Sequence, residues 1–165
     1  MDLLSLIPDN ITELLVRIIR FTELRRRIVH RNIHSAGSPD FEPRDMPVGE
    51  FAELLRDAVA EHMRTRRLLF RDTPNIRFGP SGEMRVRPLA DAQAHALLQT
   101  NPDRYVESQL NKLLENALNR KVAEELLRQT CGTGPCLATW DLGQTCVEEN
   151  PLENSSARYG TTEQH

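Results

Sequence analysis

The stretch that decides the fold is Arg27-Ile-Val-His-Arg-Asn-Ile-His-Ser-Ala-Gly-Ser-Pro-Asp-Phe-Glu-Pro-Arg-Asp-Met46. It begins as the end of an apolar-periodic helix, turns at Gly37 and Pro39, and leaves through Phe41 as an extended segment. Glycine tolerates the left-handed conformation that ends many helices, and proline cannot continue a helix. The stretch therefore predicts a junction between a long N-terminal helix and the segment that follows it.

Upstream of this junction, the sequence predicts a helix over residues 9–36. Asn10-Ile-Thr-Glu13 has the spacing of a capping box, so we expect the helix to start at Asp9 or Asn10. Apolar residues recur at helical intervals, and the opposite side carries arginines. The apolar stripe consists of Ile11, Leu14, Leu15, Ile18, Ile19, Leu24 and Ile28.

Downstream, the pattern predicts a second helix, a β-hairpin and a short third helix. The second helix is expected from Val48 to about Phe70. The period then changes to two over about 75–88, around a turn at Gly79-Pro-Ser-Gly82, which is typical of a hairpin. A short helix is expected from Ala90 to Leu98. One face of the second helix carries Phe51, Leu54, Leu55, Ala58 and Val59.

The last helix is predicted over 102–130, and its apolar stripe mirrors that of the first. Each stripe needs a partner face, either by antiparallel packing of the first helix on the last or by packing against neighbouring copies. We therefore expect a mainly α, elongated domain over 1–130, with its terminal helices paired and a second helix and hairpin between them. Residues 131–165 are expected to form a flexible acidic tail. The stripe of the last helix is Val106, Leu110, Leu113, Leu114, Ala117, Leu118, Val122, Leu126 and Leu127.

Composition narrows the class of protein. A chain of 165 residues suffices for one domain with a modest core, and only 5% of its residues are aromatic. The net charge of −3 argues against a general nucleic-acid binder, because such domains are normally basic. No run approaches the roughly 18 apolar residues of a membrane span. Pro8 interrupts the apolar start and no cleavage site follows, so we expect no cleaved signal peptide.

Two groups of potential metal ligands have simpler explanations. His30 and His34 are spaced to share a helix face, but no third ligand is near, which favours a solvated helix end. Cys131, Cys136 and Cys146 lack the paired spacing of a structural zinc site. The sequence also contains no nucleophile elbow and no phosphate-binding glycine loop. We expect no enzymatic activity, no metal and no cofactor.

Two arginine clusters, residues 25–31 and 64–71, are candidates for phosphate binding. No aromatic residues alternate with these arginines, and nearby Glu23, Asp57 and Glu61 reduce the local positive charge. Contacts with acidic neighbours or solvent explain the clusters better. They leave one alternative function, a cytoplasmic helical adaptor or regulator that binds nucleic acid through these arginines.

Segments near both ends of the chain resemble the bacterial flagellar rod and hook proteins, and most closely their proximal rod members. Leu24–Leu55 has the family's basic helix end, its turn and its second apolar segment, and Asp40 stands where the family has a turn glycine. Leu113-Leu-Glu-Asn-Ala-Leu118 is similar to the family's C-terminal helix, with Leu126-Leu127 after it. The first segment carries Asn32-Ile33, Ser35-Ala36, Ser38-Pro39, Phe41 and Arg44-Asp45.

The resemblance implies a structural subunit of the flagellar basal body, located in the periplasmic rod and exported without a cleaved signal peptide. Its partners would be other rod subunits, copies of itself and the flagellar type III export apparatus, with no nucleic acid and no membrane span. The terminal helices would pair in the inner core of the rod. The expected assembly residues are Ile11, Leu14, Ile18, Leu24, Asn32, Ile33, Pro39, Phe41, Leu110, Leu114, Asn116, Leu118 and Val122.

Overall fold

The computed structural model describes residues 6–79, 82–131 and 146–147. Helices account for 68% of these residues, so the prediction of a mainly helical protein with a small hairpin is confirmed. The predicted tail lies almost wholly outside the described residues. The elements are α1 (Leu6–His34), β1 (Arg44–Asp45), α2 (Val48–Thr65), β2 (Ile76–Phe78), β3 (Met84–Val86), β4 (Leu89–Ala90), α3 (Ala92–Thr100), α4 (Pro102–Cys131) and β5 (Cys146–Val147).

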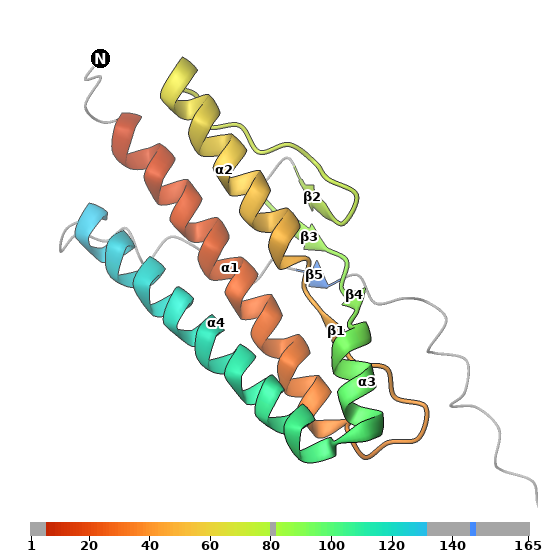
Figure 1. The fold of residues 1–165 in the computed structure, drawn as a ribbon. Helices are drawn as coiled ribbons and strands as arrows, with labels where there is room; N and C mark the ends of the chain where they lie inside the picture. Colours follow the sequence, from red (N-terminus) through yellow and green to blue (C-terminus); the bar gives the residue numbers. More distant parts are fainter. Residues whose placement is uncertain (1–5, 80–81, 132–145, 148–165) are drawn as a thin grey trace, which may run out of the picture.

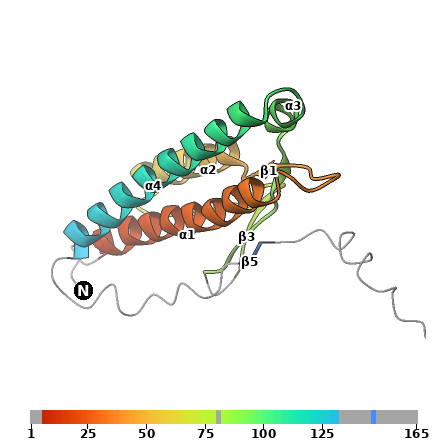
Figure 2. The same cartoon turned by 90° about the horizontal axis from the view of Figure 1, so that it is seen from below.

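Helix α1 is central to the arrangement. It lies between α4 and α2 in Figure 1, and Figure 2 shows α4 on one side of α1 and β3 on the other. Strands β2 and β3 form an antiparallel hairpin in which Ile76 pairs with Val86, and β5 lies parallel to β3. Strands β1 and β4 form a separate antiparallel pair that joins Arg44 to Ala90. This second pair ties the segment after α1 to the segment before α3.

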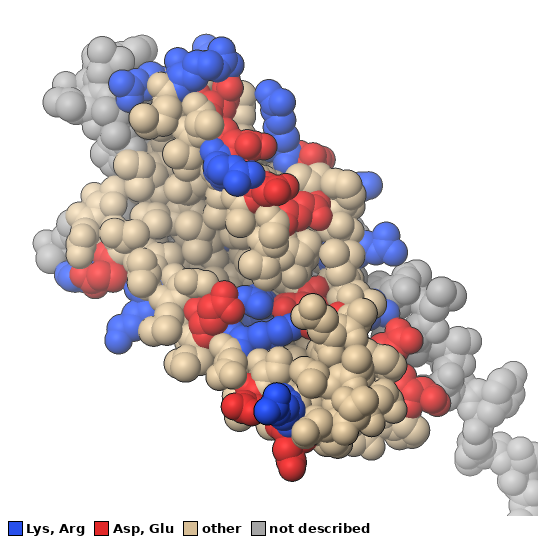
Figure 3. Space-filling model, in the orientation of Figure 1, with Lys and Arg blue, Asp and Glu red and all other residues tan. Residues whose placement is uncertain are grey.

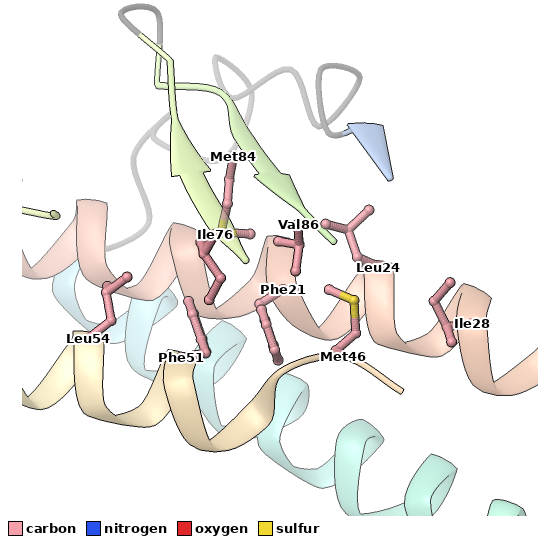
Figure 4. Close-up of a cluster of buried hydrophobic side chains, with 9 residues drawn as sticks. All are labelled: Phe21, Leu24, Ile28, Met46, Phe51, Leu54, Ile76, Met84 and Val86. Atoms are coloured by element: carbon pink, nitrogen blue, oxygen red, sulfur yellow. The ribbon is translucent and has the colours of Figure 1, made fainter. Parts of the chain in front are cut away.

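The larger core cluster joins α1, α2 and the hairpin (Figure 4). The rings of Phe21 and Phe51 stack with their centroids 3.9 Å apart. Both strands of the hairpin alternate as predicted: Ile76, Met84 and Val86 are fully buried on the inner face, and Phe78 on the same face is half-buried. The cluster contains Phe21, Leu24, Ile28, Met46, Phe51, Leu54, Ile76, Met84 and Val86.

A second, smaller cluster joins the first half of α1 to the end of α4. It contains Leu15, Val16 and Ile19 from α1 with Ala123 and Leu127 from α4. Because early residues of α1 meet late residues of α4, the two helices run antiparallel. The buried apolar cluster that the two helices share lies at this end.

Several predicted helix boundaries are wrong, and among them α1 ends at His34 instead of residue 36 and α3 ends at Thr100 instead of Leu98. Helix α1 begins at Leu6, ahead of the expected capping box, since proline is tolerated in a helix's first turn. Helix α2 ends at Thr65 instead of Phe70, because Arg66 takes a left-handed conformation with a φ of 63° and its N–H bonds to the His62 carbonyl. Helix α3 begins at Ala92, where the carboxylate of Asp91 accepts a hydrogen bond from the Ala94 amide and caps the helix.

Candidate assembly interface

The face of α4 that contacts α1 is mostly polar. Tyr105 and Gln109 are fully buried, and Asn116 is 4% exposed. These side chains lie four and seven residues apart, so they share one face of the helix. We call this face the polar seam; it consists of Tyr105, Gln109, Lys112, Asn116 and Arg120.

Hydrogen bonds across the polar seam fix the register of the two helices. The Asn116 side-chain amide donates to the Thr22 carbonyl at 2.7 Å. The Asn32 amide donates to Gln109 at 3.0 Å, and the Tyr105 hydroxyl donates to the Asn32 carbonyl at 2.9 Å. A buried polar group without a partner is costly, so any slip of one helix along the other would leave several such groups unpaired.

Asn32 also holds the chain as it returns from the junction. Its side-chain NH2 group donates to the Arg44 main-chain carbonyl at 2.7 Å, and its side-chain oxygen accepts from the Arg44 main-chain amide at 3.2 Å. A single side chain therefore connects α1, β1 and, through Gln109, α4. This explains why asparagine is found at a fully enclosed position near the end of a helix.

An ionic cluster lies beside Asn32 at the same level of α1 and α4. Lys112 donates to Asp45 at 2.8 Å and also to Asp91, while Arg25 donates to Asp45 at 3.0 Å. Burial tends to raise the pKa of Asp45, but the hydrogen bonds from Arg25 and Lys112 outweigh it and lower that pKa. Burial likewise opposes the charge of Lys112, yet its two carboxylate partners raise its pKa. The cluster joins α1, β1, the cap of α3 and α4.

A second ion pair, between Glu23 of α1 and Arg120 of α4, lies farther along the seam. Glu23 also accepts hydrogen bonds from Arg26, at 2.8 Å for the shorter one. The hydrogen bond from Arg26, together with that from Arg120, lowers the pKa of Glu23 to about 2. The carboxylate is therefore charged throughout the neutral range.

Most of the apolar stripe of α4 is exposed, whereas Leu127 at its end is buried against α1. The sequence led us to expect Leu110, Leu114, Leu118 and Val122 to pack on the first helix or on neighbouring copies, and the first of these options is wrong. Leu114 is 62% exposed and Leu118 is 55% exposed. Residues spaced by four form one inclined row on a helix. We call this row the α4 ridge; it consists of Leu110, Leu114, Leu118, Val122 and Leu126, all of which are at least 46% exposed.

The remaining expected assembly residues differ in their exposure. Leu24, Asn32 and Asn116 are buried within the monomer, so they hold its elements together and cannot reach a neighbour. Ile18 is half-buried and packs against both core clusters. Exposure is partial for Leu14, Ile33 and Phe41 and greater for Ile11 and Pro39.

The junction after α1 forms a wide hollow of about 880 Å³ against α3 and the start of α4. Pro39 and Phe41 line it, opposite Leu98 and Val106. Asp40, between them, has a φ of 59°, a left-handed conformation that favours glycine. The junction therefore has a defined backbone course, with strain at the position where the resembling family carries glycine.

The structure gives little support to the two alternatives drawn from the sequence, nucleic-acid binding by the arginine clusters and metal binding by histidines or cysteines. In the first arginine cluster, Arg25 pairs with Asp45, and Arg26 and Arg27 pair with Glu23. The rings of His30 and His34 lie 6.3 Å apart on the exposed side of α1. Among the described residues, no three His, Cys, Asp or Glu side chains come close enough to bind a metal ion. The cysteine side chains considered for zinc binding lie outside the described part of the chain.

Sequence reasoning missed most of the polar seam. Its residues follow one another at intervals of three and four, and continue at Ala123 and Leu127. That spacing was visible in the sequence, but the adjacent row of leucines gave a stronger apolar signal. The seam would have been found by asking which face of the last helix carries long polar side chains that can match polar groups on the first.

Comparison of the chain with protein-family models, curated proteins and solved structures finds no match. None of the helices in the described part of the chain has the length and apolar character of a membrane span. The functional assignment therefore depends on the geometry of this chain and on the motifs in its sequence.

Proposed function

We propose that this protein is a structural subunit of the bacterial flagellar basal body, in the proximal rod. It is an elongated subunit whose paired terminal helices form its inner part. It assembles with copies of itself and with other rod subunits after export without a cleaved signal peptide. It acts by packing, with no catalysis.

The observation that carries the proposal is that α4 turns its polar face, and not its row of leucines, toward α1. Its polar residues face α1, and its row of leucines faces outward along a helix of 30 residues. An isolated exposed leucine needs no explanation, but a continuous apolar row is typical of a surface that another protein covers. Burial of each such side chain stabilises an assembly by on the order of 1 kcal/mol.

The motifs that resemble rod proteins lie together in the structure, which supports the proposal. Asn32 and Asp45 of the N-terminal motif contact Gln109 and Lys112 of α4. Asn116, in the C-terminal Glu-Asn-Ala-Leu motif, contacts the main chain of α1. Arg25 of the N-terminal motif also lies 3.9 Å from Glu115 of the C-terminal motif. Both motifs therefore lie along the contact between α1 and α4, as expected if each serves to pair the terminal helices.

The conformation of Asp40 adds separate support. The resembling family has glycine in this turn, and here the position adopts a positive φ, which glycine accepts without strain. The backbone conformation of Asp40 is therefore the one expected for the family's turn glycine, although this chain has aspartate at the position.

The alternative of a nucleic-acid-binding adaptor is less well supported. Phosphate contacts need exposed arginines, whereas Arg25 is buried against Asp45 and Arg64 pairs with Glu61 at 2.8 Å. In the second cluster this leaves Arg66, Arg67 and Arg71 as the other exposed arginines. Nucleic-acid binding would also give no reason for the continuous apolar row on α4.

Cell fractionation tests the proposal. In the bacterium that encodes the chain, a tagged copy should co-purify with detergent-extracted basal bodies, and deletion of the gene should abolish the rod and motility. A chain found only in the cytoplasm, or a deletion strain with normal flagella, would rule the proposal out.

A further inference from the structure

A strip of α1 is left uncovered between α2 and α4. Ile18 packs against both core clusters, so it lies where the two clusters meet. Leu14 and Ile11 precede it by four and seven residues and therefore share its face of the helix. Ile11 is 41% exposed. Figure 3 shows a broad uncharged area between α2 and α4 at the N-terminal half of α1.

Helix α2 extends this apolar strip. Its flank that carries Glu50, Glu53 and Asp57 faces the segment 69–74, with which it lines a hollow. The opposite flank carries Val59, which is 42% exposed, and Met63, which is 72% exposed.

Together these residues define an apolar surface at the N-terminal end of the bundle. We call it the open face; it consists of Ile11, Leu14 and Ile18 of α1 and Val59 and Met63 of α2. It is bordered on α2 by Arg56, which precedes Val59 by three residues and Met63 by seven and so lies on the same side of the helix.

The first three leucines of the α4 ridge match the open face in length and in apolar character. Leu110 to Leu118 spans about 12 Å of helix, and Ile11 to Ile18 spans about 10 Å. The ridge cannot reach the open face of its own molecule, because the opposite side of α4 is held to α1 by the polar seam. Only a second molecule can bring the two surfaces together.

Charges beside the two surfaces are also complementary. Glu107 precedes Leu110 by three residues and Leu114 by seven, so it lies next to the ridge, and it is exposed. Arg56 lies next to the open face, and its contact with Glu53 is long at 3.8 Å, with both side chains at least 70% exposed. Such a surface pair contributes little in the monomer, so Arg56 is free to meet a carboxylate from outside.

We propose that Leu110, Leu114 and Leu118 of one copy pack on the open face of a second copy, with Glu107 beside Arg56. The contact joins two different surfaces, so every copy keeps one of each for further neighbours, and the assembly is a helical filament or a ring. This inference rests on the proposed assembly function and adds which surfaces of the chain meet.

Disulfide trapping between two differently tagged preparations tests the contact. Cys131, Cys136 and Cys146 are first replaced by serine; one preparation then carries Leu114→Cys and the other Met63→Cys. Oxidation of the concentrated mixture should give a disulfide between the two preparations. A disulfide mainly between two Leu114→Cys chains, or no disulfide at all, would overturn the inference.

A charge exchange gives the matched control. Glu107→Arg in the Leu114→Cys chain should reduce the disulfide yield several-fold, and Arg56→Glu in the Met63→Cys chain should do the same. Both changes together should restore the yield. Equal yields from all four mixtures would contradict the proposed register. All these positions are exposed, and circular dichroism establishes that each variant is folded.

The two proposals fail in different ways. If the chain is found in basal bodies but the trapped contact joins two α4 ridges, the inference is wrong and the rod function stands. If the predicted disulfide forms but the chain is absent from basal bodies, the rod function is wrong and the contact stands.

Discussion

Asn116 on α4 donates a 2.7 Å hydrogen bond to the main-chain carbonyl of Thr22 on α1, across 94 residues of sequence. Leu114 and Leu118, on either side of Asn116 in the chain, are more than half exposed. The helix thus buries the Asn116 side chain against α1 and exposes Leu114 and Leu118 to solvent. This arrangement favours a subunit whose own terminal helices are joined by specific polar contacts and whose apolar surface serves other molecules.

Replacement of Asn116 by alanine should destabilise the monomer. The variant loses a buried hydrogen bond, and we expect the free energy of unfolding to fall by about 1–3 kcal/mol. Urea unfolding followed by circular dichroism measures the change. Asn119→Ala is the control, because Asn119 lies in the same helix but is exposed, and it should cost less than about 0.5 kcal/mol. Equal losses for both variants would mean that the polar seam is not a specific contact.

Leu114→Gln should leave the monomer nearly unchanged and impair assembly. Leu114 is 62% exposed and glutamine is a comparably good helix former, so the expected change in stability is within about 0.5 kcal/mol. Leu127→Gln is the contrasting variant. Leu127 is 3% exposed in the α1–α4 cluster, and its loss should cost about 2–5 kcal/mol. A large loss at Leu114 in a dilute monomer would show that the ridge is covered within the molecule.

The pH dependence of stability should contain a contribution from Glu23. Its folded pKa of about 2 lies below the ordinary value of 4.5, so its ion pairs stabilise the fold above pH 4.5. That stabilisation is lost as the pH falls from 4.5 towards 2. Glu23→Gln should therefore be less stable than the parent at pH 7, and the two should converge near pH 2. Urea titrations at several pH values test this, and a constant difference down to pH 2 would contradict it.

The hairpin should depend on Arg17. Its guanidinium donates to the Gly82 carbonyl and lies 5.4 and 5.1 Å from the ring centroids of Phe70 and Phe78. Arg17→Met keeps much of the side-chain volume but removes these polar contacts. We expect amide hydrogen exchange over 76–86 to become about tenfold faster. Arg77→Met, on the exposed side of the hairpin, should leave it unchanged.

The sequence predicted the existence of the principal elements because their periodicities are strong. The hairpin is an example: Ile76, Met84 and Val86 alternate with arginines, and all three are fully buried. Helix ends were harder to predict, since they depend on tertiary contacts. Phe70 continues the helical pattern of α2 but leaves the helix to pack beside Phe78, with ring centroids 5.3 Å apart.

The sequence predicted the leucine row on α4 but not the direction in which it faces. Apolar spacing identified the leucine row but could not say whether the row faced inward or outward, because a stripe fits an internal partner as well as an external one. The answer depends on Asn116, Gln109 and Lys112, whose partners lie far away in sequence. Hydrogen bonds of this kind leave no periodic signal in the apolar pattern.

The most direct test of the central claim is the reactivity of a cysteine at position 114 before and after assembly. The Leu114→Cys chain, with its three native cysteines replaced by serine, is treated with a maleimide reagent as a dilute monomer and within purified basal bodies. We expect rapid labelling in the monomer and at least a tenfold slower reaction in basal bodies, because the α4 ridge is then covered. Equal reactivity in both states, or absence of the chain from basal bodies, would contradict the account.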